Sequence, residues 1–173
     1  YFSSFLTNAG LTWKDVKQIP AVGLRQHWNL FKQGKVDVAM AGVGGGPNKD
    51  MNAKIPSGVR YISFNTDTSG AMKATTNLKG GKYEKVGKKK NYVAIREPAV
   101  LFGYDFTLFT NKNVSTDTVY AVTKVMHDSV KDFHAVSGVW RSYNEKRMSK
   151  DQGGLAYHAG AMKFYKEKGL WKR

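Results

Sequence analysis

Hydrophobic residues recur every three or four positions in several stretches of the chain, which is the spacing of one helix face. This spacing predicts helices over residues 2–9, 24–33, 115–133 and 159–168. Glycines at positions 10, 34 and 169 stand where three of these helices should end, as is common at helix C-termini. In the third helix, Ser115 or Thr116 is expected to cap the N-terminus and Asp117 to favour its positive end.

The core-facing positions follow from the same spacing. In the third helix they are Val119, Val122, Met126, Val130 and Phe133. In the last helix the spacing leaves two alternatives: Met162 with Tyr165, or Ala161 with Phe164. We also expect one helical turn over residues 49–53 and a weak helix over 69–78.

Short apolar runs predict strands over residues 17–22, 36–41 and 59–64. Residues 36–41 are almost all small or β-branched, as in strands buried on both faces of a parallel sheet. Residues 17–41 thus form a predicted strand–helix–strand unit with short connections. A fourth strand is expected over residues 101–110, where Phe102, Tyr104, Phe106 and Leu108 alternate with smaller or polar residues. The pattern indicates an α/β fold.

A glycine-rich loop, residues 42–47, follows the predicted strand 36–41 and ends at Pro47. In open α/β sheets, ligands bind outside the carboxyl ends of the strands. Four glycines leave the backbone N–H groups accessible to a ligand. The spacing matches neither the dinucleotide nor the Walker pattern, so a nucleotide is not expected. A ligand-lining loop is favoured over a merely flexible connection.

Lys and Arg total 28 against 13 acidic residues, which gives a net charge of +15 and invites a nucleic-acid hypothesis. The polar stretch 75–91, expected to be a loop, carries lysines at positions 79, 82, 85, 88, 89 and 90. Only Tyr83 and Tyr92 supply rings nearby, and no known nucleic-acid-binding motif is present. A solvated basic loop is therefore favoured over a phosphate-binding arm.

The sequence contains little that would support catalysis. It has no cysteine, and its four histidines lack metal-ligand spacing. Serine-hydrolase and zinc-protease motifs are absent, and no pair of acids is placed for acid–base work. We expect neither an enzyme nor a cofactor. No apolar run reaches membrane-spanning length.

Asp105 stands inside the predicted strand 101–110, where a buried carboxylate without a partner is costly. It is therefore expected to cap a loop, hold a hinge or touch a ligand, with the structural roles favoured.

The segment Leu155–Trp171 closely resembles the C-terminal end of the TAXI-family solute receptors of TRAP transporters. Ala159 stands where that family usually has proline. Residues 104–109 and 111–114 resemble the family's strand and its lead into the following helix. Residues 34–39 and the loop 44–47 match further family segments. The similarity spans essentially the whole chain.

The resemblance implies two α/β lobes of the type II periplasmic-binding-protein kind. Residues 1–103 would be lobe two, residues 104–112 the return crossover or hinge, and residues 113–173 the helical part that packs on lobe one. The chain starts inside a predicted helix without an initiator Met, so we expect the front of lobe one to be missing. One lobe would be nearly complete, with the C-terminal helices of the other.

The same resemblance implies a periplasmic receptor that captures a small organic anion, expected to be a carboxylate, and delivers it to the membrane subunits of a TRAP transporter. We expect a monomer that binds no nucleic acid. The expected ligand-binding residues are Gly44, Gly45, Gly46, Pro47, Arg96, Tyr104 and Asp105. The alternative is a basic module that binds nucleic acid or another anionic polymer through the lysines of residues 79–90.

Overall fold

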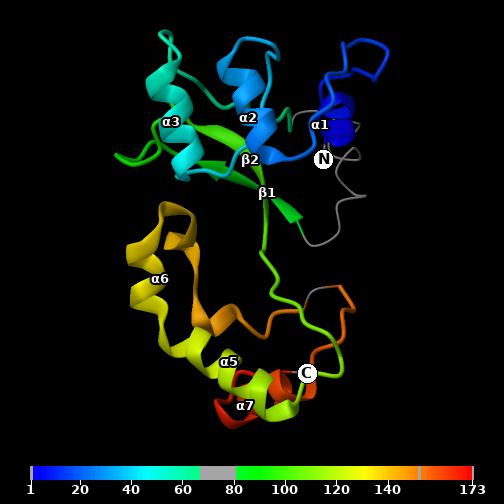
Figure 1. Cartoon of the computed structure of the whole chain (residues 1–173), viewed down its shortest axis with the longest axis vertical. Coiled ribbons are helices and arrows are strands. Elements are labelled where there is room, and N and C mark those ends of the chain that lie inside the picture. The colour runs from blue at the N-terminus through cyan, green and yellow to red at the C-terminus, as the bar shows by residue number, and fades with distance from the viewer. Residues whose placement is uncertain (1, 67–80, 152, 173) are drawn as a thin grey trace. The chain divides into compact units, whose positions relative to one another are not determined.

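The structure, a computed structural model, describes residues 2–66, 81–151 and 153–172. The chain divides into two compact units, Tyr1–Tyr104 and Asp105–Arg173 (Figure 1). In its described residues, the first unit combines helices with a small sheet, and the second is built from helices and loops. This mixed architecture is compatible with an α/β binding protein. The predicted assignment of lobes and hinge stays a prediction.

The first unit contains α1 (Phe2–Asn8), α2 (Leu24–Lys32) and α3 (Gly46–Lys54). The predicted helices 2–9 and 24–33 are thus confirmed, and α3 is longer than the single turn expected over 49–53. Gly34 follows α2 with φ +67°, the left-handed conformation that suits glycine at a helix end. The predicted helix 69–78 lies outside the described residues.

In the part of the chain that the structure describes, the sheet has two antiparallel strands, β1 (Gly81–Val86) and β2 (Ala99–Tyr104). Gly81 pairs with Tyr104 and Val86 with Ala99. The prediction of a loop over 75–91 is therefore wrong for β1. The predicted strand 101–110 ends early because the pairing stops at Tyr104, opposite the first residue of β1.

The predicted strands 17–22 and 36–41 do not form, so the parallel strand–helix–strand unit is also wrong. In the first segment Pro20 lacks a donor, and the Val22 amide donates to Gln26 Oε1 at 2.6 Å instead of to a neighbouring strand. In the second segment, side chains of α2 bind both the amide and the carbonyl of Met40. Side chains thus form hydrogen bonds with backbone amide and carbonyl groups that would otherwise pair with a neighbouring strand.

The predicted strand 59–64 is wrong for a related reason. Tyr61 donates its amide to Ala94 O at 3.0 Å, and Phe64 donates to Val100 O at 2.8 Å. Between them, Ser63 Oγ accepts from the Val100 amide at 2.9 Å. A side-chain oxygen therefore replaces the backbone carbonyl, and no regular ladder results.

Aromatic rings build much of the first unit's core. Phe5 lies 4.4 Å from Phe64, Phe64 lies 5.1 Å from Tyr83, and Tyr83 lies 6.2 Å from Phe102, between ring centroids. This series connects α1 to both strands. Edge-on and tilted pairs of this kind stabilise a core beyond the apolar area that they bury.

The second unit contains α5 (Thr116–Asp128), α6 (Val130–Val136), the 3-10 turns η1 (Gly138–Ser142) and η2 (Glu145–Arg147), and α7 (Ala159–Glu167). Ser115 Oγ accepts from the Thr118 amide at 3.1 Å, which confirms the predicted cap. The predicted continuous helix 115–133 is broken at Ser129. Val122 is 45% exposed, so the predicted core stripe is wrong there.

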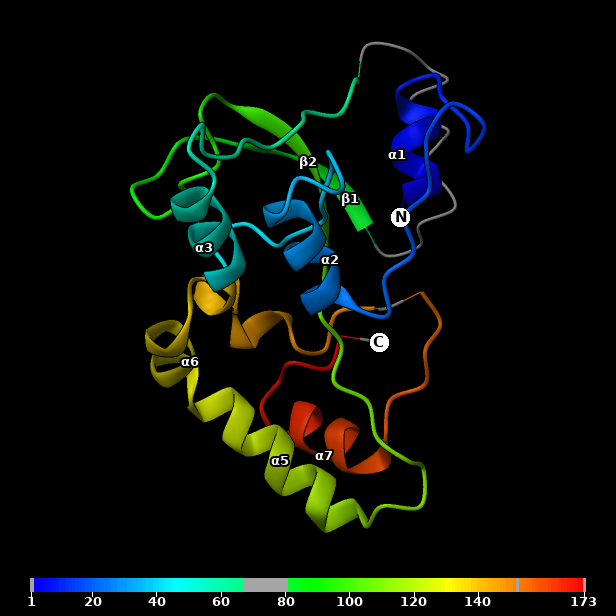
Figure 2. The ribbon, with the colours of Figure 1, turned by 45° about the horizontal axis from the view of Figure 1, so that its top comes forward.

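α7 packs on α5 and forms the core of the second unit (Figure 2). Ala161, Phe164 and Tyr165 are buried and pack against Val119 and Tyr120 of α5. The alternative Ala161 with Phe164 is therefore confirmed, and of the other pair Tyr165 is buried whereas Met162 is half-buried.

Gly160 lies at the closest approach of α5 and α7. A Cβ at this position would lie only 2.3 Å from Thr116 O and 2.7 Å from Tyr120 N. The two helices can pack at this distance only because residue 160 has no side chain.

Candidate binding loop and the adjoining pocket

The candidate site is the glycine loop, residues 42–47, and the N-terminus of α3 that follows it. Gly44 has φ +76°, a conformation that favours glycine, and both Gly44 and Gly45 are buried. Gly45 is the N-cap residue of α3, and Pro47 stands in its first turn. The loop therefore turns sharply and leads directly into a helix.

A buried polar network fixes the start of this loop. Tyr61 Oη donates to Ala41 O at 3.0 Å and accepts from Asn48 Nδ2 at 2.5 Å. The same Asn48 amide nitrogen donates to Gly42 O at 2.5 Å. Asn48 is only 4% exposed, and burial raises the pKa of Tyr61 to about 12. The tyrosine thus remains a neutral donor that holds the loop backbone in place.

The N-terminus of α3 presents backbone donors that no side chain caps. Gly45 has no side-chain oxygen to cap the helix, and the first turn of α3 contains no acidic residue. The first N–H groups of a helix have no partner within the helix, and the helix dipole places partial positive charge there. Such an end favours an anion.

Two side chains of α2 fix the segment that enters the loop. His27 Nε2 accepts from the Met40 amide at 2.9 Å, and the Trp28 indole N–H donates to Met40 O at 2.9 Å. His27 must be neutral to accept this bond, and burial lowers the pKa of His27. α2 thereby positions the backbone just before the loop.

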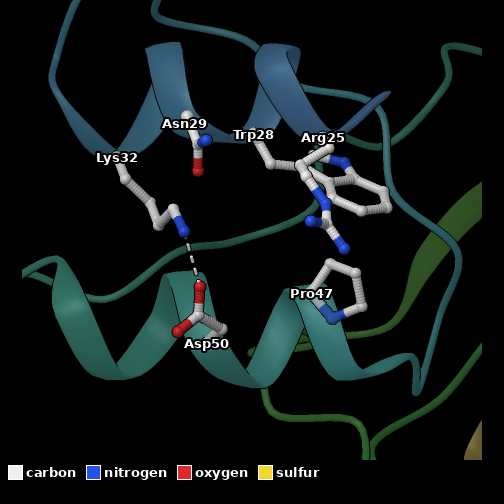
Figure 3. Close-up of a pocket in the computed structure, with 6 residues that line it drawn as sticks. All are labelled: Arg25, Trp28, Asn29, Lys32, Pro47 and Asp50. Carbon is white, nitrogen blue, oxygen red and sulfur yellow. Dashed lines mark hydrogen bonds and ion pairs between the residues drawn. The ribbon is translucent and has the colours of Figure 1, made fainter. Parts of the chain in front are cut away.

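A pocket of about 430 Å³ adjoins the loop and opens between α2 and α3 (Figure 3). It is lined by Arg25, Trp28, Asn29, Lys32, Pro47 and Asp50. At one end, Lys32 Nζ lies 2.7 Å from Asp50 Oδ2, and Lys54 Nζ lies 2.8 Å from Asp50 Oδ1. Hydrogen bonds from these two lysines lower the pKa of Asp50.

Arg96 does not lie at the glycine loop. Its Nη2 donates to Ser57 O at 2.6 Å and its Nε donates to Val59 O at 3.1 Å. These carbonyls follow the C-terminal end of α3, whereas the loop precedes its N-terminal end. A nine-residue helix is about 13 Å long, so its two ends are well separated. The structure gives the Arg96 guanidinium a structural contact, and its predicted role with a ligand stays a prediction.

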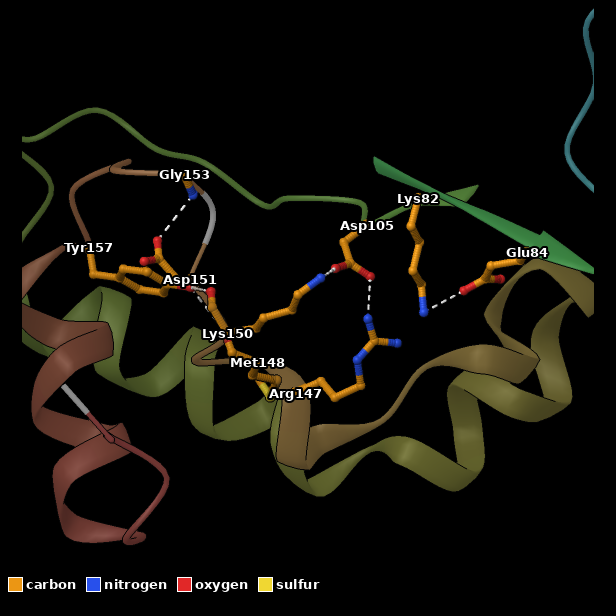
Figure 4. Close-up of polar contacts among 9 residues, drawn as sticks. All are labelled: Lys82, Glu84, Asp105, Arg147, Met148, Lys150, Asp151, Gly153 and Tyr157. Atoms are coloured by element: carbon orange, nitrogen blue, oxygen red, sulfur yellow. Dashed lines mark hydrogen bonds and ion pairs between the residues drawn. The ribbon is translucent and has the colours of Figure 1, made fainter. Parts of the chain in front are cut away.

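Tyr104 and Asp105 stand at the division between the units. Tyr104 ends β2, is 46% exposed and has its ring 6.3 Å from that of Phe102. Asp105 lies in the second unit, where Arg147 Nη2 approaches one carboxylate oxygen at 2.7 Å and Lys150 Nζ the other at 2.6 Å (Figure 4).

Burial raises the pKa of Asp105, but the Lys150 hydrogen bond and the two cationic charges outweigh it and leave the pKa below its usual value. The predicted partner for this carboxylate therefore exists, and it ties the segment after β2 to η2 and Lys150. A ligand contact of Asp105 stays a prediction.

The sequence did not indicate roles at this site for Asn48, Tyr61, Arg25 and Asn29. Arg25, Asn29 and Lys32 are four and three residues apart, which places them on one face of α2, and that spacing was readable in the sequence. The contact of Asn48 with Tyr61 joins positions thirteen residues apart, and no local pattern signals it.

Among the described residues, no group of His, Cys, Asp or Glu could hold a metal ion. Within the same parts of the chain, no helix is both long and apolar enough to cross a bilayer.

Fold and loop together are compatible with an α/β binding protein whose candidate loop lies at a helix N-terminus. A family model described as the NMT1-like family matches residues 1–169. The match covers almost the entire chain, and the chain belongs to the NMT1-like family. This is a family of the periplasmic solute-binding type, and its members are usually extracytoplasmic. A search of curated proteins found no match.

Proposed function

We propose that the protein is a periplasmic receptor that captures a small organic anion, a carboxylate, for a TAXI-type TRAP transporter. One observation carries the proposal. In a chain of a solute-binding-type family, the loop at Gly44–Pro47 leads into a helix whose N-terminal donors no side chain caps. A carboxylate has the charge and the acceptor oxygens that such an end prefers. The resemblance of residues 155–171 to TAXI receptors supports the transporter class.

The Asn48–Tyr61 network supports the same proposal. It holds the Ala41 and Gly42 carbonyls by hydrogen bonds, which orients them into the protein. The loop is therefore already shaped without a ligand, and preorganisation of this kind reduces the cost of binding.

A second candidate is the basic module that binds an anionic polymer. The net charge of +15 favours it. In the described part of the basic stretch, however, Lys82 pairs with Glu84 at 2.6 Å and Lys89 lies over the Tyr92 ring at 5.2 Å. Local partners thus engage two of its lysines.

The test is calorimetry with a panel of small mono- and dicarboxylates and with a single-stranded oligonucleotide. Gly44→Ala should weaken acid binding at least about tenfold, because φ +76° is strained for any residue with a side chain. Gly87→Ala is the matched control, since residue 87 lies outside the loop and a Cβ there meets nothing within 4 Å. If the protein binds the oligonucleotide but none of the acids, the receptor proposal is contradicted.

A further inference from the structure

The pocket between α2 and α3 has one cation that no described residue neutralises. Arg25 is exposed and makes no hydrogen bond or ion pair with any of the described residues. Figure 3 shows its guanidinium extending from α2 toward Pro47, beside the Trp28 ring. A free guanidinium presents a planar set of donors that matches the two oxygens of a carboxylate.

The only acid lining this pocket in the described residues is already satisfied. Lys32 and Lys54 each occupy one oxygen of Asp50. Arg25 and Lys32 are seven residues apart on α2, which separates the Arg25 end from the Asp50 end by about 10 Å along the helix. At that distance salt largely screens exposed charges from one another. An anion at Arg25 is therefore not repelled strongly by Asp50.

The walls near Arg25 are suited to a flat apolar group. The Trp28 ring is held in place by its hydrogen bond to Met40 O at 2.9 Å, and the Pro47 ring is rigid. Asn29 is exposed, and its side-chain amide has no hydrogen-bond partner in the described structure. It can therefore bind a polar substituent. A pocket of about 430 Å³ is within the range that small-molecule sites occupy.

We propose that this pocket binds the carboxylate of a small organic acid with a flat apolar body, and that Arg25 recognises the carboxylate. The inference rests on the proposed function for the class of ligand and adds the recognising side chain and the shape of the acid. The acid's body lies between Trp28 and Pro47, and Asn29 contacts its edge. Pro47 belongs to both the pocket and the glycine loop, so the two features adjoin.

The test uses benzoate as the probe. Its binding to the full chain is measured by ¹H–¹⁵N NMR and by calorimetry. Benzoate should shift the Trp28 indole and Asn29 side-chain signals. Benzamide has the ring without the charge, and acetate has the charge without the ring, so each should bind about tenfold more weakly or worse.

The Arg25→Gln variant should bind benzoate about tenfold more weakly, because it loses a charge-assisted pair of hydrogen bonds. Arg25→Lys keeps the charge but loses the planar fork, and should be intermediate. The control is Arg60→Gln, which removes the same charge from an exposed arginine of the same unit and should stay within about twofold. The spectra also establish that each variant is folded.

Two outcomes would overturn the proposal that this pocket binds a carboxylate through Arg25. The first is the absence of any benzoate shift at Trp28 and Asn29, and the second is equal weakening by Arg25→Gln and Arg60→Gln. The carboxylate panel separates this failure from that of the receptor. If an acid binds the wild type and Arg25→Gln equally well, the receptor function is still supported, but recognition of the carboxylate by Arg25 is contradicted. Failure of every acid contradicts both.

Discussion

A few buried or half-buried polar side chains hold the candidate binding loop in shape. Asn48 and Tyr61 bind the backbone at the start of the loop, and His27 and Trp28 bind the backbone just before it. A buried polar group costs free energy unless it is hydrogen-bonded, so each of these side chains depends on its partners. The loop geometry is thus set by residues outside the glycines themselves.

Replacement of Asn48 by Ala should lower the free energy of unfolding by about 1–3 kcal/mol, because the Gly42 carbonyl and the Tyr61 hydroxyl lose a buried partner. Urea unfolding followed by circular dichroism measures this change. Asn29→Ala is the control, since that side chain is exposed and should change stability by less than about 0.5 kcal/mol. Equal effects of the two variants would contradict the network.

The protonation of the His27 ring should make the stability of the protein depend on pH in the mildly acidic range. Burial lowers the pKa of His27, so the unfolded chain binds this proton more readily than the folded chain. The stability that neutral His27 contributes is therefore present above its ordinary pKa of about 6.5 and is lost as pH falls through the lower folded value.

NMR titration should show the Met40 amide signal moving with the His27 ring signals as the pH falls. The His27→Gln variant keeps an acceptor without a titration in this range, so its Met40 signal should stay constant. A wild-type Met40 signal that does not move while the His27 ring titrates would show that the bond is not formed.

At the scale of elements, the sequence predicted the helices better than it predicted the strands. α1, α2 and α7 begin and end near their predicted positions, and α5 begins at its predicted cap, because periodic apolar residues, Ser115 and the terminal glycines act locally. α5 ends at Asp128, before the predicted end at residue 133. Strands need partners far away in the sequence. Pro20 and the side-chain bonds to Met40 removed those partners for two of them, and only β2 among the predicted strands formed.

The contact between α5 and α7 yields the sharpest prediction at this scale. Gly160→Ala would place a Cβ against backbone atoms of α5, which cannot move as a side chain does. Unfolding by urea should show a loss of about 1–3 kcal/mol. Gly87→Ala is the matched control, because a Cβ at residue 87 meets nothing within 4 Å. A stable Gly160→Ala variant would mean that the helices are farther apart than described.

At the scale of the whole molecule, composition and charge predicted less than the motifs did. The net charge of +15 suggested a polymer-binding protein, whereas the tail at residues 155–171 indicated a solute receptor. The family match over residues 1–169 agrees with the solute-binding class. Pro47, which the sequence singled out, lines the pocket, and its contact with a ligand stays a prediction. The spacing of Arg25, Asn29 and Lys32 marks one face of α2, but only the position of α3 beside α2 shows that this face lines a pocket.

Salt should distinguish the two candidate functions. Polymer binding releases many counterions, and its affinity should fall by about a thousandfold or more over a tenfold rise in salt. Recognition of one carboxylate by one loop or one arginine should fall by less than about tenfold over the same range. Calorimetry at about 0.05 M and 0.5 M salt measures both. A steep loss for the small acid would contradict binding at a single site.

The most direct test of the receptor account is native mass spectrometry of the protein as purified, followed by release and identification of any bound molecule. We predict a complex with one small carboxylate that is retained in moderate salt and released on denaturation. A protein that carries no small acid, but carries nucleic acid that salt removes, would contradict the receptor account and favour the basic module.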